Sequence, residues 1–143
     1  MSDDFQGRSM GDDYRSDDLR DSPMMAHLLD ALEEGTDIGH YGRLTFVMVA
    51  RHFLDDQELL DLLEKQPGVE PKDAKIMLMQ VKERDYNPPQ RRTIMQWQQE
   101  QDFPICPDEN NPLGCNVYRE LRFPEHIYEQ IGDYWEERVE AEE

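Results

Sequence analysis

The stretch that decides the fold is Gly35–Leu54, GTDIGHYGRLTFVMVARHFL. Its second half places apolar side chains on nearly every face of a helix: Leu44, Phe46, Val47, Met48, Val49, Phe53 and Leu54. A helix that is apolar all round lies buried in the middle of a protein. We therefore predict a central helix over Ile38–Leu54, with the other helices packed around it.

The beginning of this helix has a different character, because it carries basic side chains. His40 and Arg43 are three residues apart and share one face of the helix. Arg51 returns to that face two turns later. The pattern predicts a basic stripe where the central helix emerges from the core.

Helix punctuation divides the rest of the chain. Pro23 and Gly35 bracket one helical segment, as helix starts and stops prefer, and Asp55 with Glu58 forms a capping-box pattern before another. The further predicted helices are Met24–Glu34, a helix after Asp55 to about Lys65, Pro71–Arg84, Arg91–Gln101 and Pro124–Val139. We therefore predict an all-α fold, a single compact domain of about six helices.

The domain is predicted to cover residues 23–143. Residues 1–22 are mostly Asp, Ser, Gly and Arg with few apolar side chains, so they cannot bury enough surface to fold. They are predicted to form a disordered acidic tail.

Charge and cysteine content limit the functional classes. The chain has 33 acidic and 15 basic residues, a net charge of −18, and such a balance argues against nucleic acid as a partner. An alternative cause is a halophilic source, since concentrated salt screens the self-repulsion of an acidic surface. Without a long apolar run or a secretory leader, and with two cysteines, we expect no membrane contact and a reducing, cytoplasmic location.

No enzymatic motif is visible, and the cysteines leave several interpretations open. The chain lacks a glycine-rich phosphate loop, a zinc-protease motif and a nucleophile elbow, so we predict that it is not an enzyme. Cys106 and Cys115 are separated by eight residues, and two thiolates do not complete a tetrahedral metal site. They are either two half-buried thiols, a contact that closes a loop, or part of a metal or redox site.

The basic residues suggest a phosphate site. His40 with Arg43, and Arg91 with Arg92 after the Pro-Pro turn, could bind phosphate oxygens, for which the arginine fork is suited. The alternative for Arg43 is a salt bridge to one of the many acidic residues. Tyr86 and Trp97 could stack a nucleic-acid base, although core packing is the commoner role of a tryptophan.

The order of motifs resembles a known family. Between Pro23 and Pro124 the chain is similar to the C-terminal, iron–sulfur domain of the large subunit of archaeal and eukaryotic DNA primase. The motifs that carry the resemblance are Ser22-Pro23-Met24, Leu28-Leu29, Gly35, His40-Tyr41-Gly42-Arg43, Tyr86-Asn87-Pro88-Pro89, and the acidic loop from Cys106-Pro107-Asp108 to Gly114-Cys115. The resemblance implies a helical domain.

The family holds a [4Fe–4S] cluster on four cysteines, and this chain departs from that pattern. Met24 and Arg91 stand where the first two cysteines would be, and only Cys106 and Cys115 match the last two. A thioether is a poor substitute for a thiolate and a guanidinium is none. We therefore expect no cluster and no other cofactor, with apolar packing around Met24 and Arg91 turned outward. In this the chain is more similar to the cluster-less, non-catalytic third subunit of some archaeal primases.

The resemblance implies a function in starting RNA primers during DNA replication. Such a domain binds the initiating nucleotide, the 5′ triphosphate or the primer–template DNA and works with the primase catalytic subunit or other replication proteins. By motif match, His40 and Arg43 are the implied phosphate or template contacts, and helix-face and turn geometry add Arg51, Arg91 and Arg92. Two alternatives stay open: a degenerate helical module that binds only proteins, and a metal or redox protein using Cys106 and Cys115.

Overall fold

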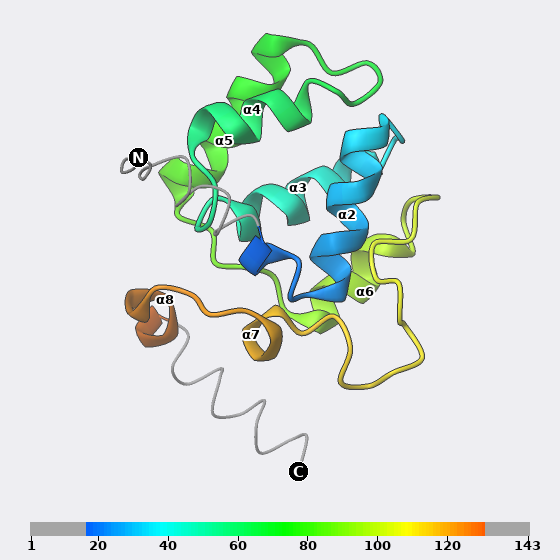
Figure 1. Cartoon of the computed structure of the whole chain (residues 1–143), viewed down its shortest axis with the longest axis vertical. Helices are drawn as coiled ribbons and strands as arrows, with labels where there is room; N and C mark the ends of the chain where they lie inside the picture. The colour runs from blue at the N-terminus through cyan, green and yellow to red at the C-terminus, as the bar shows by residue number, and fades with distance from the viewer. Residues whose placement is uncertain (1–16, 131–143) are drawn as a thin grey trace, which may run out of the picture.

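Helix α3 lies at the centre of the protein (Figure 1). The structure is a computed structural model, and it describes residues 17–130. The helices are α2 (Pro23–Glu34), α3 (Gly39–Ala50), α4 (Asp56–Leu63), α5 (Pro71–Arg84), α6 (Arg91–Gln98), α7 (Val117–Glu120) and α8 (Glu125–Gln130). The α3 helix packs against α2, α4, α5 and α6. Residues 17–130 contain no β-strand, so the predicted all-α fold is confirmed.

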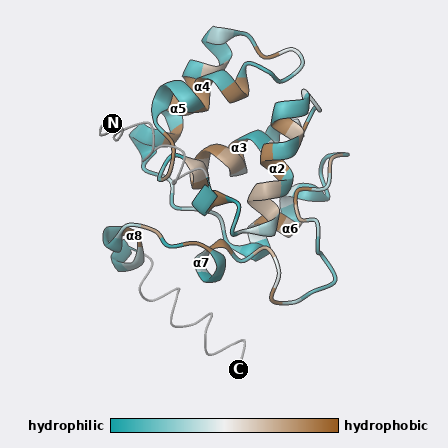
Figure 2. Ribbon diagram, viewed as in Figure 1, coloured by the Kyte–Doolittle hydropathy of each residue, from teal (hydrophilic) through white to brown (hydrophobic). Residues whose placement is uncertain are grey.

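Burial of α3 explains why it organises the fold. Phe46, Val47, Val49 and Ala50 are fully buried, and apolar residues dominate α3 in Figure 2. The surrounding helices are amphipathic and show hydrophilic segments outside, as helices on the surface of a bundle do. The prediction was too long at both ends, because α3 begins at Gly39 and turns replace it after Ala50.

Two glutamines from distant loops accept hydrogen bonds from backbone N–H groups at the beginning of α3. The backbone N–H of Ile38 donates to Gln66 Oε1 at 3.0 Å, and that of Tyr41 donates to Gln101 Oε1 at 2.9 Å. Ile38, the residue before the helix, has no capping side chain, so these long-range bonds add to the local bond that the Gly39 N–H donates to Asp37 Oδ1 at 2.9 Å. The Gln101 side chain lies so close to Gly39 that an added Cβ would be 2.5 Å from its Oε1. Gly39 therefore permits this arrangement, and it also adopts a positive φ of 78°.

The other helix boundaries follow the punctuation with some differences. The α5 bounds are those predicted, and Asp55 and Glu58 make the expected reciprocal capping box before α4. The α6 helix ends at Gln98, three residues before the predicted end at Gln101. The short helix α7 was not predicted, and the Asn116 side chain caps its beginning. The last predicted helix is described only as α8, because its part beyond residue 130 lies outside the described residues.

Part of the segment predicted as a tail is packed against the helical domain. Leu19, inside the predicted tail, is fully buried in the core, and Arg20 forms ion pairs with Asp30 and Glu33 at 3.0 and 3.5 Å. A single leucine and an arginine were too weak a signal to mark this segment in an acidic context. The remainder of the predicted tail, residues 1–16, lies outside the described residues.

Cys106 and Cys115 form a disulfide, with their Cα atoms 5.8 Å apart, and both residues are 3% exposed. Of the open interpretations, the loop-closing contact is the one that the structure contains, and the interpretation as two separate thiols was wrong. Eight intervening residues are enough for the loop to bring the two cysteines together, but the spacing alone does not require a bond between them. Every helix within residues 17–130 is too short or too polar to cross a lipid bilayer.

Candidate functional site

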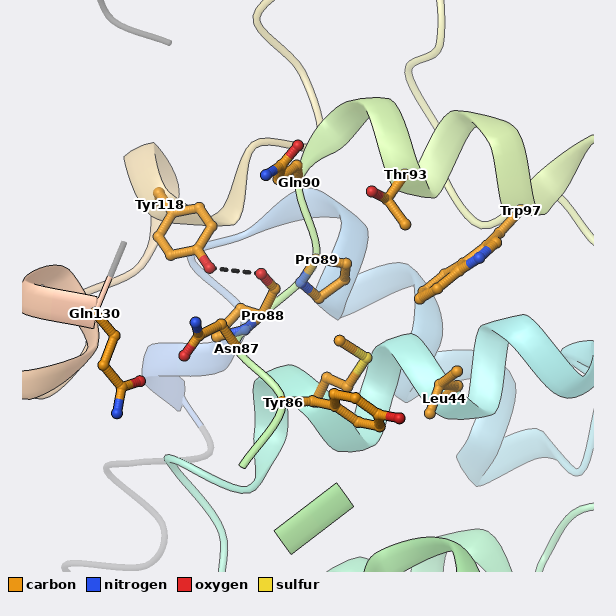
Figure 3. Close-up of a pocket in the computed structure, with 11 residues that line it drawn as sticks. Leu44, Tyr86, Asn87, Pro88, Pro89, Gln90, Thr93, Trp97, Tyr118 and Gln130 are labelled. Carbon is orange, nitrogen blue, oxygen red and sulfur yellow. Dashed lines mark hydrogen bonds between the residues drawn. The ribbon is translucent and has the colours of Figure 1, made fainter. Parts of the chain in front are cut away.

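A pocket of about 580 Å³ opens where α3, the Pro-Pro segment and α6 meet (Figure 3). This volume is within the range of small-molecule sites. The lining residues are Leu44, Met48, Tyr86, Asn87, Pro88, Pro89, Gln90, Thr93, Trp97, Tyr118 and Gln130. The pocket thus gathers side chains from α3, the α5–α6 connection, α6, α7 and α8.

The Pro-Pro segment forms one wall of this pocket and is held in place. Each proline keeps the residue before it extended, so the backbone from Asn87 to Gln90 cannot continue a helix. The Tyr118 hydroxyl donates a hydrogen bond to the Pro88 carbonyl (Figure 3). Pro88 and Pro89 are themselves buried. Packing and this hydrogen bond therefore fix the position of the wall and join α7 to it.

Two aromatic side chains border the pocket from different elements (Figure 3). Tyr86 lies beside α3 and is 39% exposed. Trp97 extends from α6 and is stacked on Tyr41, with ring centroids 5.3 Å apart and planes 19° from parallel. Trp97 is thus both packed and accessible, so the sequence alternatives of core packing and base stacking do not exclude each other.

The polar groups of the pocket are uncharged. They are the amides of Asn87, Gln90 and Gln130 and the hydroxyls of Thr93, Tyr86 and Tyr118, and no Asp, Glu, Lys or Arg is among the lining residues. Asn87 Oδ1 is buried and has no hydrogen-bond partner within the described part of the chain. A buried acceptor without a partner is unfavourable unless a ligand or water donates to it. This chemistry suits a flat, uncharged ring with donors on its edge.

His40 and Arg43 lie outside this pocket, on the first two turns of α3. Both line a smaller hollow of about 220 Å³ that also includes Asp73. Arg43 Nη1 is 3.2 Å from Asp37 Oδ1 and 3.3 Å from Gln66 Oε1. The salt bridge considered for Arg43 is therefore present, and a phosphate in this hollow would approach two carboxylates.

Arg51 and Arg43 bind different segments of the chain. Arg51 lies at the end of α3, about 12 Å from Arg43 by helical rise. Its Nη2 donates to Asp85 Oδ1 at 2.7 Å and to the Tyr86 carbonyl at 3.1 Å. Hydrogen bonds from Arg51 and then Gln130 lower the pKa of Asp85, so this carboxylate stays charged. Arg51 is thereby tied to the segment that carries Tyr86.

Arg91 is not turned outward, which corrects our expectation. Its Nε donates to the Gly114 carbonyl at 2.9 Å, and its Nη2 donates to the carbonyls of Glu109 and Asn111 at 2.8 and 3.1 Å. The guanidinium thus satisfies the backbone of the loop that the disulfide closes. Arg92, the next residue, is exposed and forms no ion pair with residues 17–130.

The four positions that match the family's cluster ligands do not suit an iron–sulfur cluster. Met24 is fully buried in the core, Arg91 binds backbone carbonyls, and the two cysteine sulfurs are bonded to each other. A cluster needs thiolates, which this set does not offer. Within residues 17–130 no three His, Cys, Asp or Glu side chains gather as a metal site would require.

His52, next to Arg51, makes stability depend on pH. Burial, with the nearby charges of Arg51 and His126, lowers the pKa of His52 from 6.5 to about 4. Between these two values the unfolded chain binds a proton that the folded chain does not, so the free energy of unfolding should decrease as the pH falls. Burial raises the pKa of Glu120. At pH values above the ordinary pKa of a glutamate, this group therefore makes the free energy of unfolding increase as the pH falls.

Urea denaturation at about pH 7 and about pH 4.5 tests this expectation. We expect His52→Gln to lose less stability than the wild type over this interval, because glutamine takes up no proton. Equal losses in both proteins would mean that His52 does not control the pH dependence.

No protein-family model, curated protein or solved structure matches this chain.

The sequence identified part of the pocket and missed the rest. Tyr86 and Trp97 were recognised as aromatic residues able to stack a base, and they do border one pocket. Gln90, Thr93, Tyr118 and Gln130 were missed, because an isolated polar or aromatic residue carries no spacing signal. The Pro-Pro turn was the usable indication of the pocket's position, because it keeps the chain extended between two helices.

Proposed function

We propose that this chain is a non-catalytic accessory domain of a primase, which binds a nucleotide or the end of a primer–template and so assists primer initiation in DNA replication. The proposal combines the motif order described above with one structural observation. That observation is the uncharged, aromatic-bordered pocket with the unpartnered amide oxygen of Asn87. The base of the nucleotide occupies this pocket.

The pocket composition supports recognition of a base rather than of phosphate. Aromatic rings stack on any base, and amide groups pair with the polar edge of one; an asparagine is a common partner of adenine. Beside the lining residue Tyr86, Arg51 is paired with Asp85, so the carboxylate offsets the guanidinium. Affinity should therefore depend on stacking and persist in concentrated salt, where phosphate-driven binding is lost.

The contacts to template or triphosphate are proposed to be those predicted from the sequence, namely His40, Arg43, Arg51 and Arg92. Arg91 is a weaker candidate, because backbone carbonyls already occupy its donors. We infer a cytoplasmic, halophilic and archaeal setting with a primase catalytic subunit as partner. The disulfide is unusual for that setting, because cytoplasmic thiols are ordinarily kept reduced.

Fluorescence anisotropy of a labelled primer–template with a 5′ triphosphate tests the proposal. Tyr86→Leu and Trp97→Leu should each weaken binding by about tenfold to a hundredfold, the usual effect of losing a stacked aromatic ring. Phe103→Leu is the matched control, because Phe103 is a half-buried aromatic residue that stacks on His27 outside the pocket. It should bind as the wild type does.

The same titration with Arg43→Ala examines the contact implied by the resemblance. A loss confined to low salt would identify Arg43 as a phosphate contact. Binding that no pocket variant weakens would contradict the proposed site. No binding at any salt concentration would contradict the proposed function and favour a module that binds only proteins.

A further inference from the structure

The α5 helix has a charge opposite to that of the whole chain. It carries four basic residues, Lys72, Lys75, Lys82 and Arg84, against the two acidic residues Asp73 and Glu83, a net charge of +2 in a chain of net charge −18. Three of the chain's four lysines lie on this one helix. A local basic surface on an otherwise acidic protein attracts an acidic partner and orients it.

The same helix exposes large apolar side chains. Ile76 and Met79 are 52% and 57% exposed, and their spacing of three residues places them together on one side. The opposite side of α5, with Ala74, Leu78 and Val81, is buried against α3 and α4. We call Lys72, Lys75, Ile76 and Met79 the outer face of α5.

The two lysines of the outer face are available. Lys82 pairs with Asp56 at 2.8 Å, whereas Lys72 and Lys75 form no ion pair with any residue in the described part of the chain. Both are exposed. Each lysine lies beside one apolar residue of the pair, four positions before it in the chain, since residues three and four apart are neighbours on a helix surface.

We propose that the outer face of α5 is a docking surface for an acidic amphipathic helix of a partner protein. The apolar stripe of that helix covers Ile76 and Met79, and its carboxylates pair with Lys72 and Lys75. An apolar centre with charges beside it is the arrangement by which helices dock on protein surfaces. It is less suited to a nucleic-acid backbone, because phosphates gain nothing from contact with isoleucine and methionine.

This inference is independent of the nucleotide pocket, because no outer-face residue lines it. The two can therefore fail separately. A helix docked on this face leaves the pocket open, so one chain can bind both ligands together.

The test uses the full chain and a fluorescein-labelled synthetic peptide with leucines along one helical face and glutamates along the other. The double variant Ile76→Ser/Met79→Ser should weaken peptide binding by at least about tenfold, as loss of a central apolar contact does. Lys72→Glu/Lys75→Glu should weaken it by a similar factor, and the wild-type affinity should decrease with added salt.

Matched controls exist elsewhere on the surface. Leu113→Ser removes another exposed apolar side chain, and Lys65→Glu reverses the chain's remaining lysine, so neither should change peptide affinity. Because the mutated side chains are exposed, circular dichroism should show that all variants remain folded. The Trp97→Leu protein should also bind the peptide normally.

Three results of the peptide titration would overturn the inference. They are the absence of peptide binding, an equal loss in the control variants, and equal affinity for a peptide whose glutamates are replaced by lysines. Duplex DNA binding that Lys72→Glu/Lys75→Glu removes and Ile76→Ser/Met79→Ser leaves intact would also overturn it, because the face would then recognise phosphate.

Discussion

Replacing Phe46 by alanine should lower the free energy of unfolding by about 3–5 kcal/mol. Phe46 is fully buried in the middle of α3, the helix that contacts four others. Truncation removes apolar contact area and leaves a cavity that four packed helices cannot fill by a small movement. This loss is a large share of the stability of a domain of this size. The midpoint of urea denaturation measures the change, and the slope should be unaltered.

Tyr86→Ala serves as the control for Phe46→Ala. It also removes an aromatic ring, but from a residue that is 39% exposed, so it should change stability by less than about 1 kcal/mol. A similar small effect for Phe46→Ala would contradict the placement of α3 at the centre of the core.

Removing the disulfide should cost about 2.5–3 kcal/mol of stability. The bond joins residues nine positions apart, and closing a loop of this size restricts the unfolded chain by roughly that amount in the chain-entropy model. Urea denaturation of the wild type with and without a thiol reductant measures the effect. The double variant Cys106→Ser/Cys115→Ser should match the reduced wild type.

The reductant should not change the stability of the double serine variant, which serves as the control. Arg91 should keep the loop in place at low urea, because its three hydrogen bonds to backbone carbonyls do not depend on the cysteines. Two free thiols in the oxidised wild type, or equal stability with and without reductant, would contradict the disulfide.

The elements that local chemistry determines were predictable from the sequence. A run of apolar residues around Phe46 identified the central helix, and Pro71 marked the beginning of α5. Asp55 and Glu58 formed the expected capping box. In each case the stabilising groups lie within a few residues of one another.

Long-range contacts were beyond the reach of sequence patterns. Gln66 and Gln101 cap α3 from loops that are 28 and 60 residues from their partners in the chain. Arg91 was expected outside because it stands where the family has a cluster cysteine and cannot bind iron, yet it donates to three backbone carbonyls. The pocket has the same origin, since its lining residues come from five elements that only the tertiary structure brings together.

The central claim is that the pocket beside Tyr86 and Trp97 binds the base of a nucleotide. Calorimetric titration of the wild type with adenosine or uridine, with the corresponding 5′-triphosphate, and with ribose 5-phosphate tests it most directly. The account predicts that a nucleoside and its triphosphate bind with similar affinity in molar salt, whereas ribose 5-phosphate does not bind. Binding of ribose 5-phosphate as tight as that of the triphosphate, or no binding of any of the three, would contradict it.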